Sequence, residues 1–332
     1  MRYVKIGFAI FISVVTVAAM AVFFLTRPGN LDSYSHIRFP PADQKSGPLS
    51  AQFLGVSTIY ITDGQSHIMT DGFFSRPSLG RVLFLDLEPD QETIKRSLNR
   101  AGITRLDVIV PLHSHYDHAM DSADVAKITN ATLVGSPSSA NIAIGHGLEE
   151  DRIQLVEMGR PMQIGQFRLT VIQSRHSPNP VAPTEVSEPL FPPAGYKEYA
   201  MGQCYSVLIE HPEGSALIQG SAGFEPGALD GLDVDVVFLG VGALGKQSAD
   251  YRDRYWKEVV QAVNPERIIL IHWDDFWIPL DEPLKPLPSA MDDFDSTMDW
   301  LKQKAHQESI DLVIPYEFQT MDPYAGLSNK NH

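Results

Sequence analysis

The strongest constraint on the fold of this chain is a short polar motif at residues 113–118. Three histidines and an aspartate lie within these six residues. Imidazole and carboxylate groups are costly to bury without a partner, so packing alone does not account for such a cluster. The apolar, β-branched run at residues 106–110 comes directly before it and predicts a buried strand. The motif is therefore expected just past the carboxyl end of a strand, where open α/β folds place their sites.

The spacing within the motif indicates metal ligands. In an extended segment His113 and His115 point the same way, so both can reach one ion. Asp117 and His118 follow as the chain turns and are placed to serve a second ion nearby. Neutral imidazole and carboxylate suit zinc, iron or manganese better than calcium. The motif thus predicts a transition-metal site.

The pattern His-x-His-x-Asp-His after an apolar strand resembles the signature of the metallo-β-lactamase fold superfamily. The resemblance implies an α/β fold, a four-layer αββα sandwich, with ligands that each follow a strand. His176 and His272 both stand directly after strand-like segments and match later ligand positions. The implied site places His113, His115 and His176 on metal one, and Asp117, His118 and His272 on metal two.

One position departs from the superfamily pattern. Many relatives carry Gly-Asp, with an aspartate that bridges both metals, where this chain has Gly220-Ser221. A neutral serine is a poor ligand, so the second ion is expected to bind less tightly. Ser221 either forms a hydrogen bond with metal-bound water or is a plain turn residue. Asp71 has a similar pair of interpretations: it supports the metal shell from behind, or it is a turn aspartate.

Composition narrows the class of partner. The formal net charge is −15, and an acidic surface repels phosphate backbones, so no nucleic-acid partner is expected. With 43% hydrophobic and 20% charged residues the chain is globular rather than disordered. A single cysteine, Cys204, excludes an intrachain disulfide.

The N-terminal residues predict a membrane partner. Residues 6–26 form a nearly uncharged apolar run of 21, preceded by Arg2 and Lys5. About 20 apolar residues cross a bilayer as a helix, and positive charge before them orients the remainder outside the cytoplasm. A signal peptide cleaved near Ala19-Met20-Ala21 is the alternative. We expect a transmembrane signal anchor at residues 1–27, a tether at 28–50 and the hydrolase domain at 51–332.

Several helices and two loops are predicted within the domain. Helical spacing or strand–helix alternation places helices at residues 88–101, 121–129, 250–263 and 291–304. Proline-rich loops at 178–200 and 277–288 each leave from a predicted ligand. They are expected to form pocket walls or a lid, or, for the first loop, a structured surface excursion. Asp274 and Asp275 are expected in an outer shell or in solvent.

The combined expectation is a membrane-tethered, metal-dependent hydrolase, zinc-dependent by preference, acting in the periplasm or outside the cell on a small molecule. A bound ion lowers the pKa of water from ~15.7 toward ~7, so a metal-bound hydroxide would attack an ester, lactone, amide or phosphodiester. Asp117 would orient this nucleophile or relay its proton, with Ser221 as a second catalytic candidate. The alternatives are an anchored metal-binding protein without turnover and an iron-dependent oxidoreductase on the same fold.

Overall fold

A computed structural model of the chain describes residues 16, 20, 26–40, 49–178 and 184–327. Its strands form two seven-stranded sheets. In spatial order the first sheet contains β14 (Thr320–Met321), β1 (Ser50–Phe53), β2 (Ile59–Thr62), β3 (His67–Thr70), β4 (Val108–Val110), β5 (Thr132–Gly135) and β6 (Ile153–Leu155). The second contains β13 (Asp311–Val313), β12 (Arg267–Ile271), β11 (Val236–Gly240), β10 (Gly214–Gln219), β9 (Cys204–His211), β8 (Phe167–Ser174) and β7 (Met162–Ile164).

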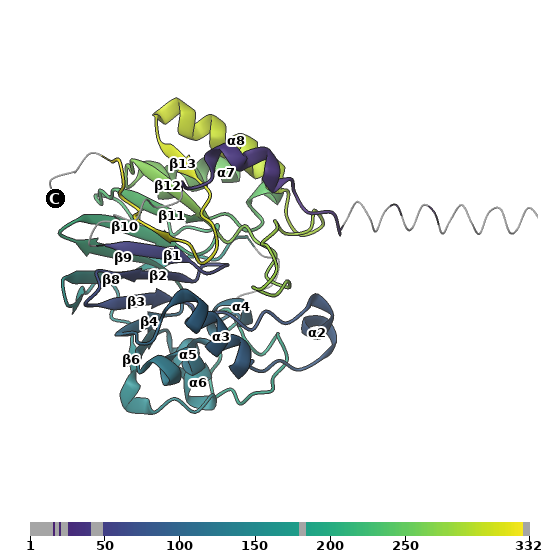
Figure 1. Ribbon diagram of the computed structural model, residues 1–332, viewed down its shortest axis with the longest axis vertical. Helices are drawn as coiled ribbons and strands as arrows, with labels where there is room; N and C mark the ends of the chain where they lie inside the picture. Colours follow the sequence, from purple (N-terminus) through teal and green to yellow (C-terminus); the bar gives the residue numbers. More distant parts are fainter. Residues whose placement is uncertain (1–15, 17–19, 21–25, 41–48, 179–183, 328–332) are drawn as a thin grey trace, which may run out of the picture.

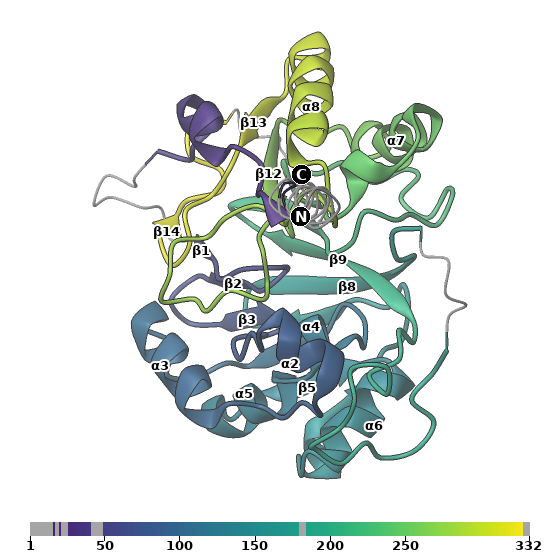
Figure 2. The ribbon, with the colours of Figure 1, turned by 90° about the vertical axis from the view of Figure 1, so that its right-hand side faces the viewer.

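Helices cover the outer face of each sheet, as Figures 1 and 2 show. On the side of the first sheet lie α2 (Leu79–Phe84), α3 (Gln91–Ala101), α4 (Tyr116–Ala119), α5 (Ser122–Thr129) and α6 (Pro137–Gly145). On the side of the second lie α7 (Ala249–Tyr255), its π-helical continuation η4 (Trp256–Gln261) and α8 (Phe294–Glu308). The described residues also form 3-10 helices at η1 (Leu31–Ile37), η2 (Glu150–Arg152) and η3 (Leu244–Lys246). The predicted αββα sandwich is confirmed.

Capping side chains explain where the helices differ from their predicted bounds. The carboxylate of Asp90 accepts hydrogen bonds from the backbone N–H groups of Glu92 and Thr93, so α3 begins at Gln91 rather than at residue 88. It ends where predicted, because Gly102 takes the left-handed conformation at φ 72°. Asp293 caps α8 in the same way, which moves its start from residue 291 to Phe294.

The two sheets enclose a continuous apolar core. Every residue of β11 and β12 is buried, and these two strands pair in parallel with register Val236 to Arg267. Parallel strands that are covered on both faces are apolar along their whole length. This is why their sequences show no alternation of polar and apolar residues.

The N-terminal region differs in part from its prediction. The predicted anchor at residues 1–27 lies almost entirely outside the described residues, among which no helix is both long and apolar enough to cross a bilayer. Part of the predicted tether packs on the domain. The ring of Tyr34 in η1 lies edge-on to Phe294, with centroids 5.6 Å apart, and the Phe39 N–H donates to the Ile314 carbonyl at 2.8 Å. Tyr34 and Phe39 are both buried against the domain, so this part of the predicted tether is held in place although its composition is mostly polar.

Candidate metal centre

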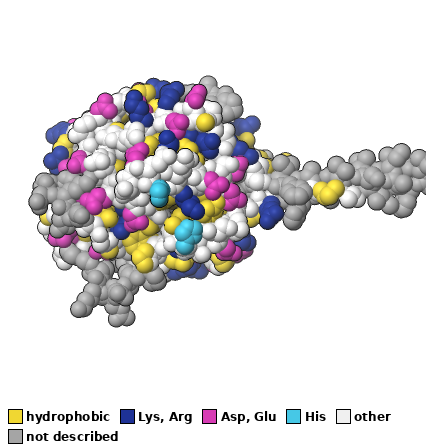
Figure 3. Space-filling model, turned by 90° about the horizontal axis from the view of Figure 1, so that it is seen from above, with side chains coloured by type: hydrophobic (Ala, Val, Ile, Leu, Met, Phe, Trp, Pro, Cys, Tyr) yellow, Lys and Arg dark blue, Asp and Glu magenta, His cyan; other side chains and the backbone are white. Residues whose placement is uncertain are grey.

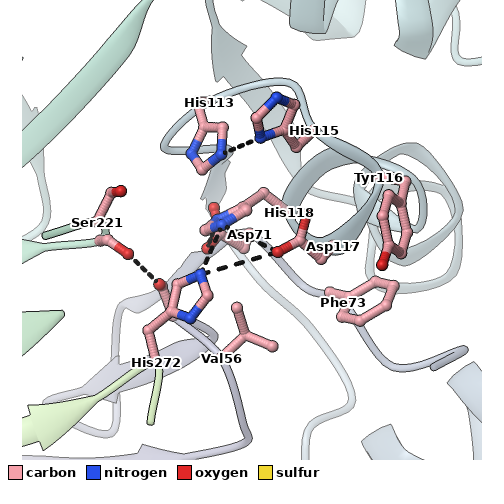
Figure 4. A network of polar contacts seen from close by, with 12 residues as sticks. Val56, Asp71, Phe73, His113, His115, Tyr116, Asp117, His118, Ser221 and His272 are labelled. Atoms are coloured by element: carbon pink, nitrogen blue, oxygen red, sulfur yellow. Dashed lines mark hydrogen bonds and ion pairs between the residues drawn. The ribbon is translucent and has the colours of Figure 1, made fainter. Parts of the chain in front are cut away.

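The predicted ligands come together at the carboxyl ends of three strands. His113 and His115 follow β4, His176 follows β8, and His272 follows β12. The one-turn helix α4 begins beside His115 and carries the remaining two predicted ligands. This arrangement confirms the expectation that the motif stands just past the end of a strand. Figure 4 shows the imidazoles of His113, His115, His118 and His272 gathered close together with the Asp117 carboxylate.

The first group of ligands forms a regular triangle. The ring centroids of His113, His115 and His176 are separated by 4.8, 4.9 and 5.0 Å. Each pair of rings is close to perpendicular, with interplanar angles between 76° and 80°. Their nitrogen atoms can therefore converge on one point, and in each ring one such atom lies within 4.8 Å of the others.

The second group is equally compact. Nε2 of His118 and Nε2 of His272 are 3.3 Å apart, and Oδ2 of Asp117 lies 3.6 and 3.8 Å from these two atoms. Donors that surround one zinc ion tetrahedrally at 2.0–2.2 Å are separated by about 3.3–3.6 Å. The spacing of this group thus fits a single ion held by two imidazoles and a carboxylate.

Asp71 orients one predicted ligand from behind. Its Oδ2 lies 2.7 Å from Nδ1 of His118, and its Oδ1 accepts the backbone N–H of Leu112 at 2.7 Å. With Nδ1 donating to the carboxylate, Nε2 of His118 carries the lone pair that faces His272. Asp71 is fully buried and holds a left-handed φ of 55°. Of its two interpretations, the structure favours support of the ligand shell.

Asp71→Asn is expected to weaken metal binding about 10- to 100-fold, because partners of this kind fix the orientation and basicity of a ligand. Competition with a fluorescent zinc chelator would measure the change. The matched control is Asp235→Asn, a buried carboxylate that binds the N–H and hydroxyl of Ser215. It should leave metal affinity unchanged. Equal affinity in the wild type and the Asp71 variant would contradict the role assigned to Asp71.

Burial sets the protonation of the cluster. It lowers the pKa of His115 to about 3 and the pKa of His272 to about 4, and it also lowers the pKa of His113, His118 and His176. These imidazoles are thus neutral at pH 7, the form that binds a metal ion. Burial raises the pKa of Asp117 to about 7, and a nearby cation would favour its carboxylate form.

Ser221 binds the loop that carries His176. Its hydroxyl oxygen accepts the N–H of Ser177 at 3.0 Å, while the Ser177 carbonyl lies 2.8 Å from Nδ1 of His176. Ser221 also lines the cavity beside the ligands. In this structure it therefore positions the His176 loop, and its predicted catalytic role stays a prediction.

The segment after His272 is held by a buried ion pair. Asp274 was predicted to lie in an outer shell or in solvent, and its burial excludes the solvent alternative. The side chains of Asp274 and Arg76 are fully buried and bonded to each other. Asp274 also accepts the N–H of Val56 at 2.9 Å, and the Val56 carbonyl accepts the N–H of His272 at 2.7 Å. Arg76 was not identified from the sequence, where it is one arginine in a loop.

A cavity of about 320 Å³ opens beside the predicted ligands. Tyr116, Phe276 and Trp277 form an aromatic wall, in which the indole N–H of Trp277 donates to the Tyr116 hydroxyl at 2.9 Å. Leu287 and Met291 extend this wall. Because Trp277 and Leu287 both belong to loop 277–288, its predicted contribution to a pocket wall is confirmed. The importance of Tyr116 was missed, although it lies within the ligand motif.

The first proline-rich loop, at residues 178–200, contributes less to the cavity wall than the second. Pro178 lines the cavity, and residues 179–183 lie outside the described part of the chain. Farther along, the loop packs on α6, where the Asn141 side chain donates to the Val186 carbonyl at 2.7 Å and Tyr199 is buried. The described part of this loop is therefore mostly a structured surface excursion.

Comparison with known proteins agrees with this geometry. The sequence profile of the beta-lactamase superfamily domain matches residues 68–273, more than half of the chain. The chain belongs to the beta-lactamase superfamily. The resemblance inferred from the ligand motif is thereby confirmed, and the matched residues include all six predicted ligands.

Relatives within the beta-lactamase superfamily are distant. A UPF0173 metal-dependent hydrolase of Roseiflexus castenholzii is 28% identical over 123 residues, 36% of this chain and 46% of the relative. The chain thus spans about half the length of that relative. One of Pyrobaculum islandicum is 23% identical over 71% of this chain and 88% of its own. The crystal structure of a "possible metal-dependent hydrolase" of Veillonella parvula, 13% identical, covers 82% of this chain and 98% of its own with a TM-score of 0.50, and so shares the fold.

Proposed function

We propose that this protein is a metal-dependent hydrolase with two metal ions in the candidate centre. The observation that carries the proposal is the pair of compact donor groups, His113–His115–His176 and Asp117–His118–His272, side by side at the strand ends. The names of the hydrolase relatives support the same reaction class.

Each residue of the candidate centre has its own role in the proposed reaction. Bound metal ions supply Lewis-acid chemistry, which polarises a carbonyl or phosphoryl group and makes water acidic enough to react at neutral pH. The five imidazoles hold the ions, and Asp71 fixes the orientation of His118. Asp117 lies at the cavity wall with its carboxylate among the ligands, where it can also orient a water molecule or accept its proton.

The cavity favours an uncharged substrate with an apolar group. Its described lining contains Tyr116, Phe276, Trp277, Leu287 and Met291 but no lysine or arginine. Beyond the proposed metal ions, which any of these substrates would meet, a phosphodiester would find no cationic side chain there, whereas an ester, a lactone or an amide needs none. We therefore place carboxylic ester, lactone and amide hydrolysis before phosphodiester hydrolysis.

The composition of the ligand set bears on the alternative reactions. Five of the six donors are imidazoles and one is a carboxylate, which suits zinc better than the carboxylate-rich sites of di-iron oxidoreductases. Hydrolysis by the zinc-loaded protein tests the proposal, using a panel of esters, lactones, amides and phosphodiesters. Turnover of at least one of them is expected. Zinc binding without any turnover would favour a metal-binding protein instead, and turnover that requires iron and oxygen would favour an oxidoreductase.

Ser221→Asp is expected to tighten binding of the second ion by about tenfold, because it adds an anionic donor at the cavity wall. Isothermal titration of the metal-free protein with zinc would resolve the two binding steps. Ser221→Asn has nearly the same shape without the charge and is the matched control. A similar change in both variants would show that charge at this position does not govern the second ion.

The location of the enzyme is proposed from the sequence. The apolar run at residues 6–26, preceded by Arg2 and Lys5, supports a membrane anchor with the domain outside the cytoplasm. The intact mass of the protein purified from membranes would distinguish an anchor from a cleaved signal peptide. Retention of the first 26 residues is expected, and a mature chain that begins near residue 22 would contradict it.

A further inference from the structure

Helix α2 exposes a cluster of large apolar side chains. Leu79, Leu83, Phe84 and Leu85 are exposed by 38%, 51%, 82% and 58%, and within the helix Val82 alone is buried. Single exposed apolar residues are ordinary, but four within the seven positions 79–85 are an unusual concentration. The one charged residue of the helix is Arg81. Apolar side chains beside a basic residue are also found in helices that lie at a membrane interface.

The N-terminal apolar run reaches the domain at the rim of the active-site cavity. The Ser289 N–H donates to the Arg27 carbonyl at 3.0 Å, and Pro28 pairs with Pro288 in a β-bridge. The neighbouring residues Leu287 and Met291 line the cavity, and Met291 is 48% exposed. A bilayer that contains residues 6–26 would therefore lie within a few residues of the cavity rim.

The apolar cluster of α2 and this entry point lie on one side of the molecule. Figures 1 and 2 show α2, α4 and the first described N-terminal residues before η1 on the side that faces the viewer in Figure 2. On the face over α7 and α8, acidic, basic and apolar side chains are interspersed (Figure 3). Among the described residues, eleven large apolar side chains are exposed, and five of them belong to α2 and its C-cap or to the cavity rim: Leu79, Leu83, Phe84, Leu85 and Met291.

We propose that the active-site face of the domain rests on a lipid bilayer, with the apolar side chains of α2 as a second membrane contact beside the N-terminal anchor. The inference rests on the proposed membrane anchor and hydrolase site. A short helix alone binds lipid weakly, but tethering makes its contact intramolecular and raises its effective concentration to the millimolar range. In this orientation the apolar cavity can take the chain of an amphiphilic ester directly from the membrane.

The depth of α2 in the membrane tests the proposal. The full-length protein is reconstituted into phosphatidylcholine vesicles with a nitroxide on Phe84→Cys; the native Cys204 is buried and does not compete for the label. We expect oxygen, which partitions into lipid, to relax the label more than water-soluble chromium oxalate does. The control is Ile128→Cys, 39% exposed in the last turn of α5, at the end of that helix far from α4. Its label should show the opposite preference.

The possible outcomes distinguish failure of the membrane docking from failure of the proposed anchor or hydrolase site, because the nitroxide signal requires neither metal nor turnover. A chain that sediments with the vesicles while the label at position 84 stays in water would overturn the docking alone. A label in lipid at both positions would overturn it too, since the contact would not be specific to α2. A chain that does not sediment with vesicles would overturn the anchor and, with it, the docking.

A second variant links docking to substrate access. Leu83→Glu/Phe84→Glu changes exposed side chains and should leave the fold intact. Turnover of a long-chain ester embedded in the vesicles is expected to fall at least about tenfold relative to turnover of a short-chain soluble ester. An unchanged ratio would contradict delivery of substrate from the bilayer. If the wild type hydrolyses neither ester, delivery of an ester from the bilayer is ruled out, while the depth measurement still decides the docking and the wider substrate panel still decides the hydrolase proposal.

Discussion

His113→Ala is expected to lower hydrolysis more than about 100-fold, since the loss of partners behind a ligand alone costs 10- to 100-fold. His113 belongs to the first triangle, and its ring also lies 3.7 Å from that of His118 in the second group. Its removal leaves His115 and His176 as a two-donor site. Steady-state turnover and zinc content per chain should fall together.

The matched control for this variant is His306→Ala. His306 is an exposed histidine in the last turn of α8, away from the candidate centre. Its variant should retain full turnover and full metal content. Unchanged turnover in His113→Ala would rule out a mechanism that depends on the first metal group.

Arg76→Met is expected to lower the free energy of unfolding by about 3–5 kcal/mol, because it leaves the Asp274 carboxylate buried without its cation. Both side chains of this pair are fully buried. Arg76 also donates to the Asp275 carbonyl at 3.2 Å, so it ties together the segment that follows His272. Urea unfolding of the metal-free protein would measure the loss without a contribution from ligand binding.

A control variant and a double variant test whether the loss of stability comes from the buried ion pair. Arg160→Met removes an exposed ion pair with Glu157 and should not change stability measurably. The double variant Arg76→Met/Asp274→Asn should recover part of the loss, because no unpaired charge then remains buried. Equal stability of the wild type and Arg76→Met would show that the ion pair does not hold the His272 segment.

The six ligands could be predicted from the sequence because each of them lies in or directly after a short segment with a recognisable pattern. His113 to His118 form a dense polar cluster, and His176 and His272 each follow a strand-like segment that stops abruptly. The αββα architecture was inferred from the family resemblance, not from these local signals.

The supporting contacts were less accessible because they join distant residues. Arg76 and Asp274 are separated by 198 positions, and the sequence around either residue contains no pattern that predicts an ion pair between them. The wall formed by Tyr116 and Trp277 depends on a contact across 161 positions. The packing of Tyr34 on α8 was hidden in the same way, because a polar, proline-containing segment predicts a tether unless its tertiary partner is known.

Metal content per chain, measured by elemental mass spectrometry on the full-length protein after equilibration with zinc and removal of free ion, tests the central claim most directly. The two donor groups, His113–His115–His176 and Asp117–His118–His272, predict two zinc ions per chain. In the His113→Ala variant we expect at most one zinc ion per chain. Folded protein that retains no metal would contradict the assignment of these six residues as ligands and the hydrolase proposed from them.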